Sequence, residues 1–222
     1  MKIVSAKKIL KGNDRIAEAN QRLFTERRIL GVNLVGSPGG GKTTLLERLL
    51  PRLLPGTKAA VVEGDLATSM DAERIEAVGV PAVQINTEGA CHLDAGMVAS
   101  ALDSLDLEGV GMLFIENVGN LVCPAGFRLG EHRRLVILSV AEGDDKVAKY
   151  PPLFQRSHGV VLNKSDMLGR IDFDLEQVER DIRRFIPEGP IFRVSAREDE
   201  GIGEVARWLL EERRCLYAND SA

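Results

Sequence analysis

The chain has 222 residues, which suits a single domain with a substantial hydrophobic core. Hydrophobic residues make up 44% and charged residues 28%, and the formal net charge of −4 does not suit a duplex nucleic-acid binder. No apolar run approaches the roughly 20 residues that cross a bilayer, and no signal-peptide pattern follows the basic start. We therefore expect a cytoplasmic protein that binds neither nucleic acid nor membranes.

The first 28 residues are predicted to form a helical arm that packs on the main body, residues 29–222. Asn13 or Asp14 suits the N-cap position of a helix, and apolar residues recur after it at helical spacing. The predicted apolar face consists of Ile16, Ala19, Leu23 and Phe24.

From residue 29 onward, short apolar runs alternate with helical patterns. The runs are apolar throughout, which is typical of parallel strands buried on both faces. The predicted strands are Ile29–Val35, Lys58–Val62, Pro81–Ile85, Met112–Ile115, Leu135–Val140, Gly159–Leu162 and Ile191–Val194. The predicted helices are Thr43–Leu54, Asp71–Val78, Leu93–Leu105, Leu175–Phe185 and Gly203–Arg214. We expect a three-layer α/β/α fold with a mostly parallel central sheet, and a functional loop over residues 117–131.

A glycine-rich turn after the first strand matches the phosphate-binding loop G-x-x-x-x-G-K-[ST] of P-loop NTPases. Glycines let backbone N–H groups surround an anion, Lys42 neutralises phosphate charge, and the Thr43 hydroxyl can bind Mg²⁺. The alternative is an ordinary strand-to-helix turn, which the full motif in this context disfavours. The predicted phosphate-binding residues are Gly36, Ser37, Pro38, Gly39, Gly40, Gly41, Lys42, Thr43 and Thr44.

A second nucleotide signal has the N-K-x-D pattern of guanine-nucleotide proteins and follows a predicted strand. An aspartate can accept hydrogen bonds from N1–H and the 2-amino group of guanine, whereas adenine has an acceptor at N1 and no 2-amino group. The pattern therefore favours GTP over ATP, although a four-letter match also arises by chance in polar turns. The predicted base-binding residues are Asn163, Lys164 and Asp166, with Ser195, Ala196 and Arg197 resembling the S-A-[KL] guanine loop.

Two acidic residues follow predicted strands and suit a magnesium site. Asp65 and Glu116 offer the oxygen ligands that Mg²⁺ prefers, alongside Thr43. Glu116 stands where the Walker B element usually has aspartate. No glutamine occupies a D-x-x-G-Q switch, so Asp65 is the candidate for positioning or deprotonating water, and Lys42 and Glu116 complete the predicted catalytic set. The alternative is a pair of solvated acids at strand ends.

Cysteine and histidine residues form a third candidate site. Cys91, His92 and Cys123 carry thiolate and imidazole ligands that suit Zn²⁺ or Ni²⁺. Three ligands fall short of the four in a structural zinc site, so an exchangeable ligand or a second subunit would complete it, the latter on a two-fold interface. Two cysteines packed as small apolar residues, with a histidine at a helix N-terminus, remain an open alternative.

Together these motifs resemble the HypB family, the nickel-incorporation GTPases of [NiFe]-hydrogenase maturation in the SIMIBI class of P-loop GTPases. The resemblance rests on six segments: Gly36–Thr43, Gly64–Ile75, Cys91–Ala95, Glu116–Pro124, Glu142–Lys146 and Asn163–Asp166. It extends over nearly the whole chain. The related urease accessory GTPases would carry Cys-Pro-His where this chain has Cys-His-Leu, which separates the two groups.

The resemblance implies a Mg²⁺-dependent GTPase that binds GTP and GDP and forms a homodimer with nucleotide. It implies a Ni²⁺ or Zn²⁺ site on Cys91, His92 and Cys123 at the subunit interface. It further implies nickel transfer to a hydrogenase large-subunit precursor, together with a HypA-type zinc-containing accessory protein. The chain lacks the family's N-terminal Cys-x-x-Cys-Gly-Cys motif and its His-rich tract, so we do not expect nickel storage.

Two other functions compete with this interpretation. A P-loop kinase for a small molecule would need an acceptor pocket, and the N-K-x-D pattern would then be a coincidence. A metal-storage protein would use nucleotide only to stabilise a dimer and would not turn it over.

Overall fold

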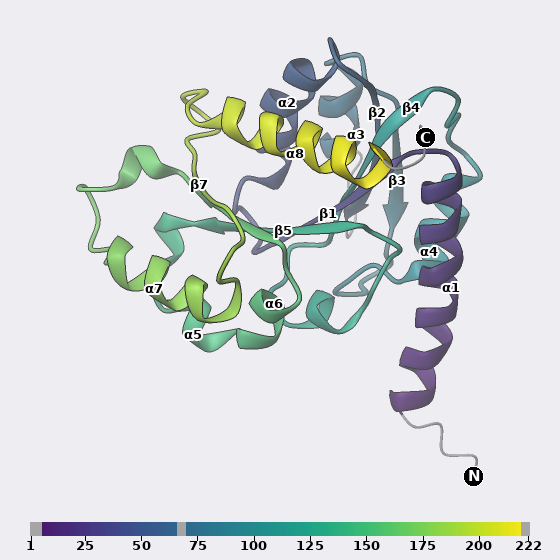
Figure 1. The fold of residues 1–222 in the computed structure, drawn as a ribbon. Helices are drawn as coiled ribbons and strands as arrows, with labels where there is room; N and C mark the ends of the chain where they lie inside the picture. Colours follow the sequence, from purple (N-terminus) through teal and green to yellow (C-terminus); the bar gives the residue numbers. More distant parts are fainter. Residues whose placement is uncertain (1–5, 66–69, 219–222) are drawn as a thin grey trace.

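The computed structural model describes residues 6–65 and 70–218, with side chains from residue 10 onward. Seven strands form one sheet in the order β3-β2-β4-β1-β5-β6-β7, and every neighbouring pair is parallel. Helices cover both faces of the sheet (Figure 1). The predicted three-layer α/β/α fold is confirmed. None of the described helices combines the length and apolar character that a membrane span needs.

All seven predicted strands are present, with shifted ends. The strands are β1 (Leu30–Gly36), β2 (Lys58–Asp65), β3 (Ala82–Asn86), β4 (Val110–Glu116), β5 (Arg133–Ser139), β6 (Gly159–Asn163) and β7 (Ile191–Arg193). The largest shift is in β2, which continues past Val62 to Asp65. Glu63 is only 2% exposed there, so a buried polar residue hid the end of the strand from a pattern based on apolar runs.

The predicted helices are also present, and two short ones were missed. The longer helices are α2 (Lys42–Leu53), α3 (Met70–Glu76), α4 (Ala95–Leu102), α7 (Leu175–Phe185) and α8 (Ile202–Tyr217). The missed helices, α5 (Lys146–Lys149) and α6 (Pro151–Gln155), are too short to show a helical period. Three 3₁₀ turns complete the order: η1 (Cys123–Gly126), η2 (Val140–Glu142) and η3 (Ser165–Met167).

Each face of the sheet has its own hydrophobic core. Helices α2, α3 and α8 cover one face (Figure 1). The buried leucines of α2 belong to one hydrophobic cluster with residues of β1 and β4. On the other face, α4 and α1 cover β2 and β4, while α5, α6 and α7 cover β5 and β6. The strands are therefore buried on both sides, as their continuous apolar character predicted.

The N-terminal arm is a helix, α1 (Ala6–Glu26), but its predicted N-cap is wrong. Asn13 lies inside the helix, where its side chain donates to the Arg128 carbonyl and accepts from the Ala95 N–H at 2.9 and 2.8 Å. The predicted apolar face is also partly wrong, because Ile16 is 42% exposed. The buried face consists of Asn13, Ala17, Asn20 and Phe24.

The two buried asparagines explain this error. Asn20 donates to the carbonyls of Ala95 and Leu129, so α1 satisfies backbone groups at the start of α4 and in the loop before β5. A pattern that looks only for apolar residues at helical spacing misses such a face. Residues 1–5 of the predicted arm lie outside the described residues.

His132, just before β5, gives a testable pH dependence. Its Nδ1 accepts from the Gly31 N–H at 3.1 Å and its Nε2 donates to the Thr25 hydroxyl at 3.1 Å, so the buried ring is held in a neutral form. Burial, with a smaller effect of Arg133, lowers the pKa of His132 from 6.5 to about 4. The unfolded chain therefore binds this proton first, and stability present above pH 6.5 is lost as the pH falls towards 4.

We expect the free energy of unfolding to fall by about 2 kcal/mol between pH 7 and pH 5 through His132 alone. His132→Asn keeps an acceptor for the Gly31 N–H but has no proton to bind. Urea unfolding of both proteins at the two pH values isolates the contribution of this residue. An equal pH dependence in the variant and the parent would contradict the assignment.

Candidate functional site

The carboxyl ends of β1, β2, β4 and β6 meet at one edge of the sheet, where the predicted nucleotide residues gather. In the sheet, β2, β3 and β4 lie on one side of β1, and β5, β6 and β7 lie on the other. The strand order therefore reverses direction at β1, and the phosphate loop that follows β1 lies at this topological switch point. Gly36 is the last residue of β1 and pairs with Ile137 of β5. Only glycine fits at this position, because a Cβ would lie 2.4 Å from the Ile137 carbonyl oxygen. Gly39 and Gly41 have φ values of 71° and 89°, which other residues rarely adopt.

A cavity of about 420 Å³ opens beside this loop. Its lining includes predicted phosphate, metal and base residues, namely Pro38, Gly39, Gly41, Lys42, Thr43, Thr44, Asp65, Glu116 and Lys164. The loop leads into the N-terminus of α2, where unpaired N–H groups and the helix dipole favour an anion. The structure thus assembles a phosphate-binding cavity from segments far apart in the sequence.

The residues present fit a magnesium ion. The Thr43 hydroxyl donates to Glu116 Oε1 at 2.9 Å, and Lys42 Nζ lies 4.0 Å from the same oxygen. Glu116 Oε2 is buried and accepts no hydrogen bond from a backbone, alcohol or cationic group of the described residues, and its carboxyl neighbour is Glu63. Asp65 ends the neighbouring strand β2 and lines the same cavity. These oxygen donors match the preference of Mg²⁺.

A buried carboxyl group that the sequence analysis missed lies beside Glu116. Glu63 pairs with Glu116 across β2 and β4 and is 2% exposed. Burial and the neighbouring Glu116 raise the pKa of Glu63 to about 10, so it is protonated at neutral pH. Burial also raises the pKa of Glu116, but Lys42 and Thr43 oppose this effect. We therefore assign the shared proton to Glu63 and the negative charge to Glu116.

Arg74 of α3 is a second polar residue of the cavity that the sequence analysis did not select. Its Nη2 donates to the Thr44 hydroxyl at 3.1 Å and to Glu47 at 2.6 Å, and its Nη1 donates to Asp71 at 3.0 Å. These contacts fix α3 against the first two turns of α2. Arg74 belongs to the segment Gly64–Ile75, whose residues 66–69 lie outside the described residues.

The predicted base-binding segments lie side by side. Asn163 is 2% exposed and links three segments: its Nδ2 donates to the Gly40 carbonyl at 2.9 Å, and its Oδ1 accepts from the N–H groups of Lys164 and Ala196. The Ser195 hydroxyl donates to Asp166 Oδ1 at 2.6 Å. The Arg197 side chain is 89% exposed, and its Nε lies 3.7 Å from Glu198 Oε1.

The predicted metal ligands also lie together. The Cys91 and Cys123 sulfur atoms are 2.8 Å apart, and Cys91 Sγ is 3.6 Å from His92 Nδ1. One donor atom of each residue lies within 4.8 Å of the others, which is close to the span of ligands bonded about 2.0–2.3 Å from one ion. Cys91 is exposed, so the group is open to solvent, as an exchangeable site requires.

The protonation of these ligands follows from their surroundings. The contact with Cys91, followed by burial, raises the pKa of Cys123. Burial lowers the pKa of His92, whose ring packs on the Phe127 ring with centroids 4.0 Å apart. A neutral imidazole can bind a metal directly, whereas a thiol must first lose its proton, so metal binding here releases protons.

The fold and the phosphate-binding cavity define a P-loop nucleotide-binding protein. The family model "CobW/HypB/UreG, nucleotide-binding domain" matches residues 31–193. The chain belongs to this family, and its relatives place it among the HypB proteins.

These relatives match over most of the chain. Hydrogenase maturation factor HypB of Azotobacter vinelandii is 52% identical over 206 residues, which cover 92% of this chain and 68% of the relative. The Escherichia coli K12 protein of the same name is 49% identical over 207 residues, covering 93% and 71%. A crystal structure of HypB from Helicobacter pylori in complex with nickel matches with a TM-score of 0.88 and 42% identity, covering 93% of this chain and 97% of that one.

Proposed function

We propose that this protein is a Mg²⁺-dependent GTPase that delivers nickel during [NiFe]-hydrogenase maturation. The observation that carries the proposal is one loop that joins two sites. Glu116, in the phosphate cavity, and Cys123, in the metal group, lie on the same segment. Midway along it, the Asn120 N–H donates to the Gly36 carbonyl at 3.0 Å, and a Cβ on Gly119 would lie 2.8 Å from Pro38. The nickel complex of the related Helicobacter pylori protein supports nickel as the cargo.

The proposed hydrolysis divides its tasks among residues of the cavity. Lys42 and the loop N–H groups bind the β- and γ-phosphates, and Asp65 orients the attacking water. Thr43, Asp65 and Glu116 would hold Mg²⁺, which supplies positive charge against the phosphate oxygens. The neutral Glu63 keeps a second negative charge away from the phosphates. Asp166 and Asn163 select guanine.

The proposed nickel site is completed by a second copy of the chain. Cys91, His92 and Cys123 supply three ligands, and Val122 beside them is 63% exposed, as suits a residue covered in a dimer. GTP would favour the homodimer, and hydrolysis would weaken nickel binding so that the ion passes on. The recipients are a hydrogenase large-subunit precursor and a HypA-type accessory protein. In this proposal residues 1–28 act as an arm on the GTPase domain, residues 29–222.

We expect the purified protein with Mg²⁺ to convert GTP to GDP and phosphate without any acceptor, and to act poorly on ATP. Asp65→Asn is expected to slow hydrolysis by about 10²–10⁴-fold, the usual contribution of a positioned base. Phosphate release measures the rate, and Asp103→Asn, at an exposed position in the C-cap of α4, is the matched control.

Other outcomes would point to the competing functions. Phosphate transfer that requires an added small molecule would indicate a kinase. A nucleotide-dependent dimer without turnover, measured by light scattering, would indicate a storage or scaffold protein.

A further inference from the structure

A chain of buried amide hydrogen bonds runs from the first metal-binding segment towards the sheet. The Leu93 N–H, next to His92, donates to Asn117 Oδ1 at 3.1 Å. Asn117 Nδ2 donates to Asn33 Oδ1 at 3.4 Å, and Asn33 Nδ2 donates to Glu131 Oε1 at 3.2 Å. Asn33 and Asn117 are 0% and 1% exposed, so the bond to Leu93 and the bond between the two asparagines are closed to solvent, while the bond to Glu131 is partly buried.

Both ends of this chain fix the orientation of the two amides. At one end a backbone N–H requires an acceptor, and at the other end the Glu131 carboxylate requires a donor. Neither amide can therefore turn over without losing a buried bond. Such a directed chain couples its members more tightly than isolated bonds do.

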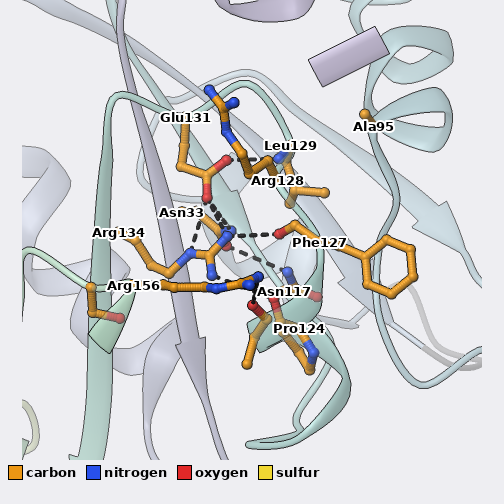
Figure 2. A network of polar contacts seen from close by, with 12 residues as sticks. Asn33, Ala95, Asn117, Pro124, Phe127, Arg128, Leu129, Glu131, Arg134 and Arg156 are labelled. Atoms are coloured by element: carbon orange, nitrogen blue, oxygen red, sulfur yellow. Dashed lines mark hydrogen bonds and ion pairs between the residues drawn. The ribbon is translucent and has the colours of Figure 1, made fainter. Parts of the chain in front are cut away.

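The Glu131 end of this hydrogen-bond chain supports the second metal-binding segment, which begins at Cys123. Glu131 forms a buried ion pair with Arg134, which also donates to the Phe127 carbonyl at 2.7 Å (Figure 2). Arg134 reaches the Pro124 carbonyl at 3.5 Å, and Arg156 donates to the Ala125 carbonyl at 2.8 Å. The network thus supports the turn η1 that begins at Cys123 and the aromatic ring that packs on His92.

Asn117 lies at the centre of this arrangement. It directly follows Glu116, and its backbone N–H continues the β1–β4 pairing by donating to the Leu34 carbonyl at 3.0 Å. A displacement of Glu116 along or across the sheet therefore moves the Asn117 side chain. Because a buried N–H without an acceptor is costly, Leu93 must follow Asn117.

We propose that Asn117 is the positioning residue through which the nucleotide state reaches the Cys91–His92 half of the nickel site. The contacts of Gly119 with Pro38 and of Asn120 with Gly36 serve the Cys123 half. On the Cys91–His92 side, the Leu93 side chain packs on Gly64 of the nucleotide cavity, and Thr87 joins Asp65 to Ala90 through backbone hydrogen bonds. Asn117 adds the side-chain hydrogen bond to the backbone N–H that directly follows His92. The inference rests on the proposed coupling of GTP and nickel and names the side chain that carries it.

The test measures the nickel dissociation constant with GDP and with a non-hydrolysable GTP analogue, each with Mg²⁺, by competition with a chromogenic chelator. The ratio of the two constants is the coupling factor, and allosteric factors are typically about 5–150-fold. For Asn117→Ala we expect this ratio to fall below about 2-fold. A residue with a merely structural role would weaken both constants equally and leave the ratio unchanged.

Asn20→Ala is the matched control, because it also removes a buried asparagine with two hydrogen bonds but does not touch the amide chain. It is expected to keep the parent ratio. Asn117→Ser serves if the alanine variant does not fold, since its side chain is too short to reach both Leu93 and Asn33, and it is expected to lower the ratio as well. A parent-like ratio in a folded Asn117 variant overturns the inference alone. A ratio of one in the parent protein overturns the proposed coupling and the inference together.

Discussion

Asp166→Asn is expected to weaken GTP binding by about 10²–10⁴-fold, because it removes a charged acceptor of two hydrogen bonds from guanine, each contributing about 1.5–3 kcal/mol. Xanthine carries a carbonyl where guanine has the 2-amino group, so the asparagine amide can donate to it. Affinity for xanthosine triphosphate is therefore expected to rise as that for GTP falls. The Ser195 hydroxyl, which donates to Asp166 at 2.6 Å, holds either side chain in place.

Competition titrations with a fluorescent nucleotide measure both affinities. Asp172→Asn is a suitable control, because Asp172 is an exposed acid in the same loop and has the same change in charge. It is expected to retain the parent preference. If Asp166→Asn also retained full selectivity for GTP, the base-binding assignment would fail.

The second large effect concerns nickel. Cys123→Ala is expected to lower nickel affinity by at least about 100-fold, since even residues that only support a ligand commonly contribute 10–100-fold. Two ligands, Cys91 and His92, then remain on each chain. GTP hydrolysis is expected to stay near the rate of the metal-free parent, because Cys123 does not line the phosphate cavity.

Equilibrium dialysis against Ni²⁺ gives the metal content of each variant. Cys215→Ala removes an exposed thiol from α8, where the sulfur contacts Glu211, and is expected to leave the content unchanged. An unchanged nickel stoichiometry in Cys123→Ala would refute the ligand set. Loss of nickel from both variants would point to non-specific binding by thiols.

The sequence predicted the fold well because its strongest signals come from burial. Continuous apolar runs identified every strand of the sheet, and the spacing of glycine, lysine and threonine identified the phosphate loop. The errors occurred where buried positions are polar. Asn13 and Asn20 concealed the inner face of α1, and Glu63 concealed the end of β2.

The fold brings together the residues that the sequence predicted for the nucleotide and metal sites, but the sequence did not predict the contacts that hold them. The sequence places Cys91 and Cys123 far apart, and only the fold brings their sulfur atoms together. Asn33 lies in no motif, and Asn117 lies in the segment Glu116–Pro124 without a partner that the sequence identifies, because an amide that bonds to backbone and side-chain groups has no fixed sequence partner. One signal was available: an asparagine inside the apolar run Ile29–Val35 is unusual, since a buried amide needs partners.

Asn163 connects the phosphate loop to the two segments predicted to bind the base. Its amide holds the Gly40 carbonyl, the Lys164 N–H and the Ala196 N–H at once, and a Cβ on Gly41 would lie 2.3 Å from its nitrogen. The proposed phosphate-binding and base-binding segments are thus joined before a nucleotide binds, which lowers the entropy cost of ordering them. Because Asn163 contacts both segments, a mutation in one is expected to affect the other. A larger residue at position 41 would displace Asn163 and lower the selectivity for guanine, and a shorter residue at position 163 would weaken phosphate binding.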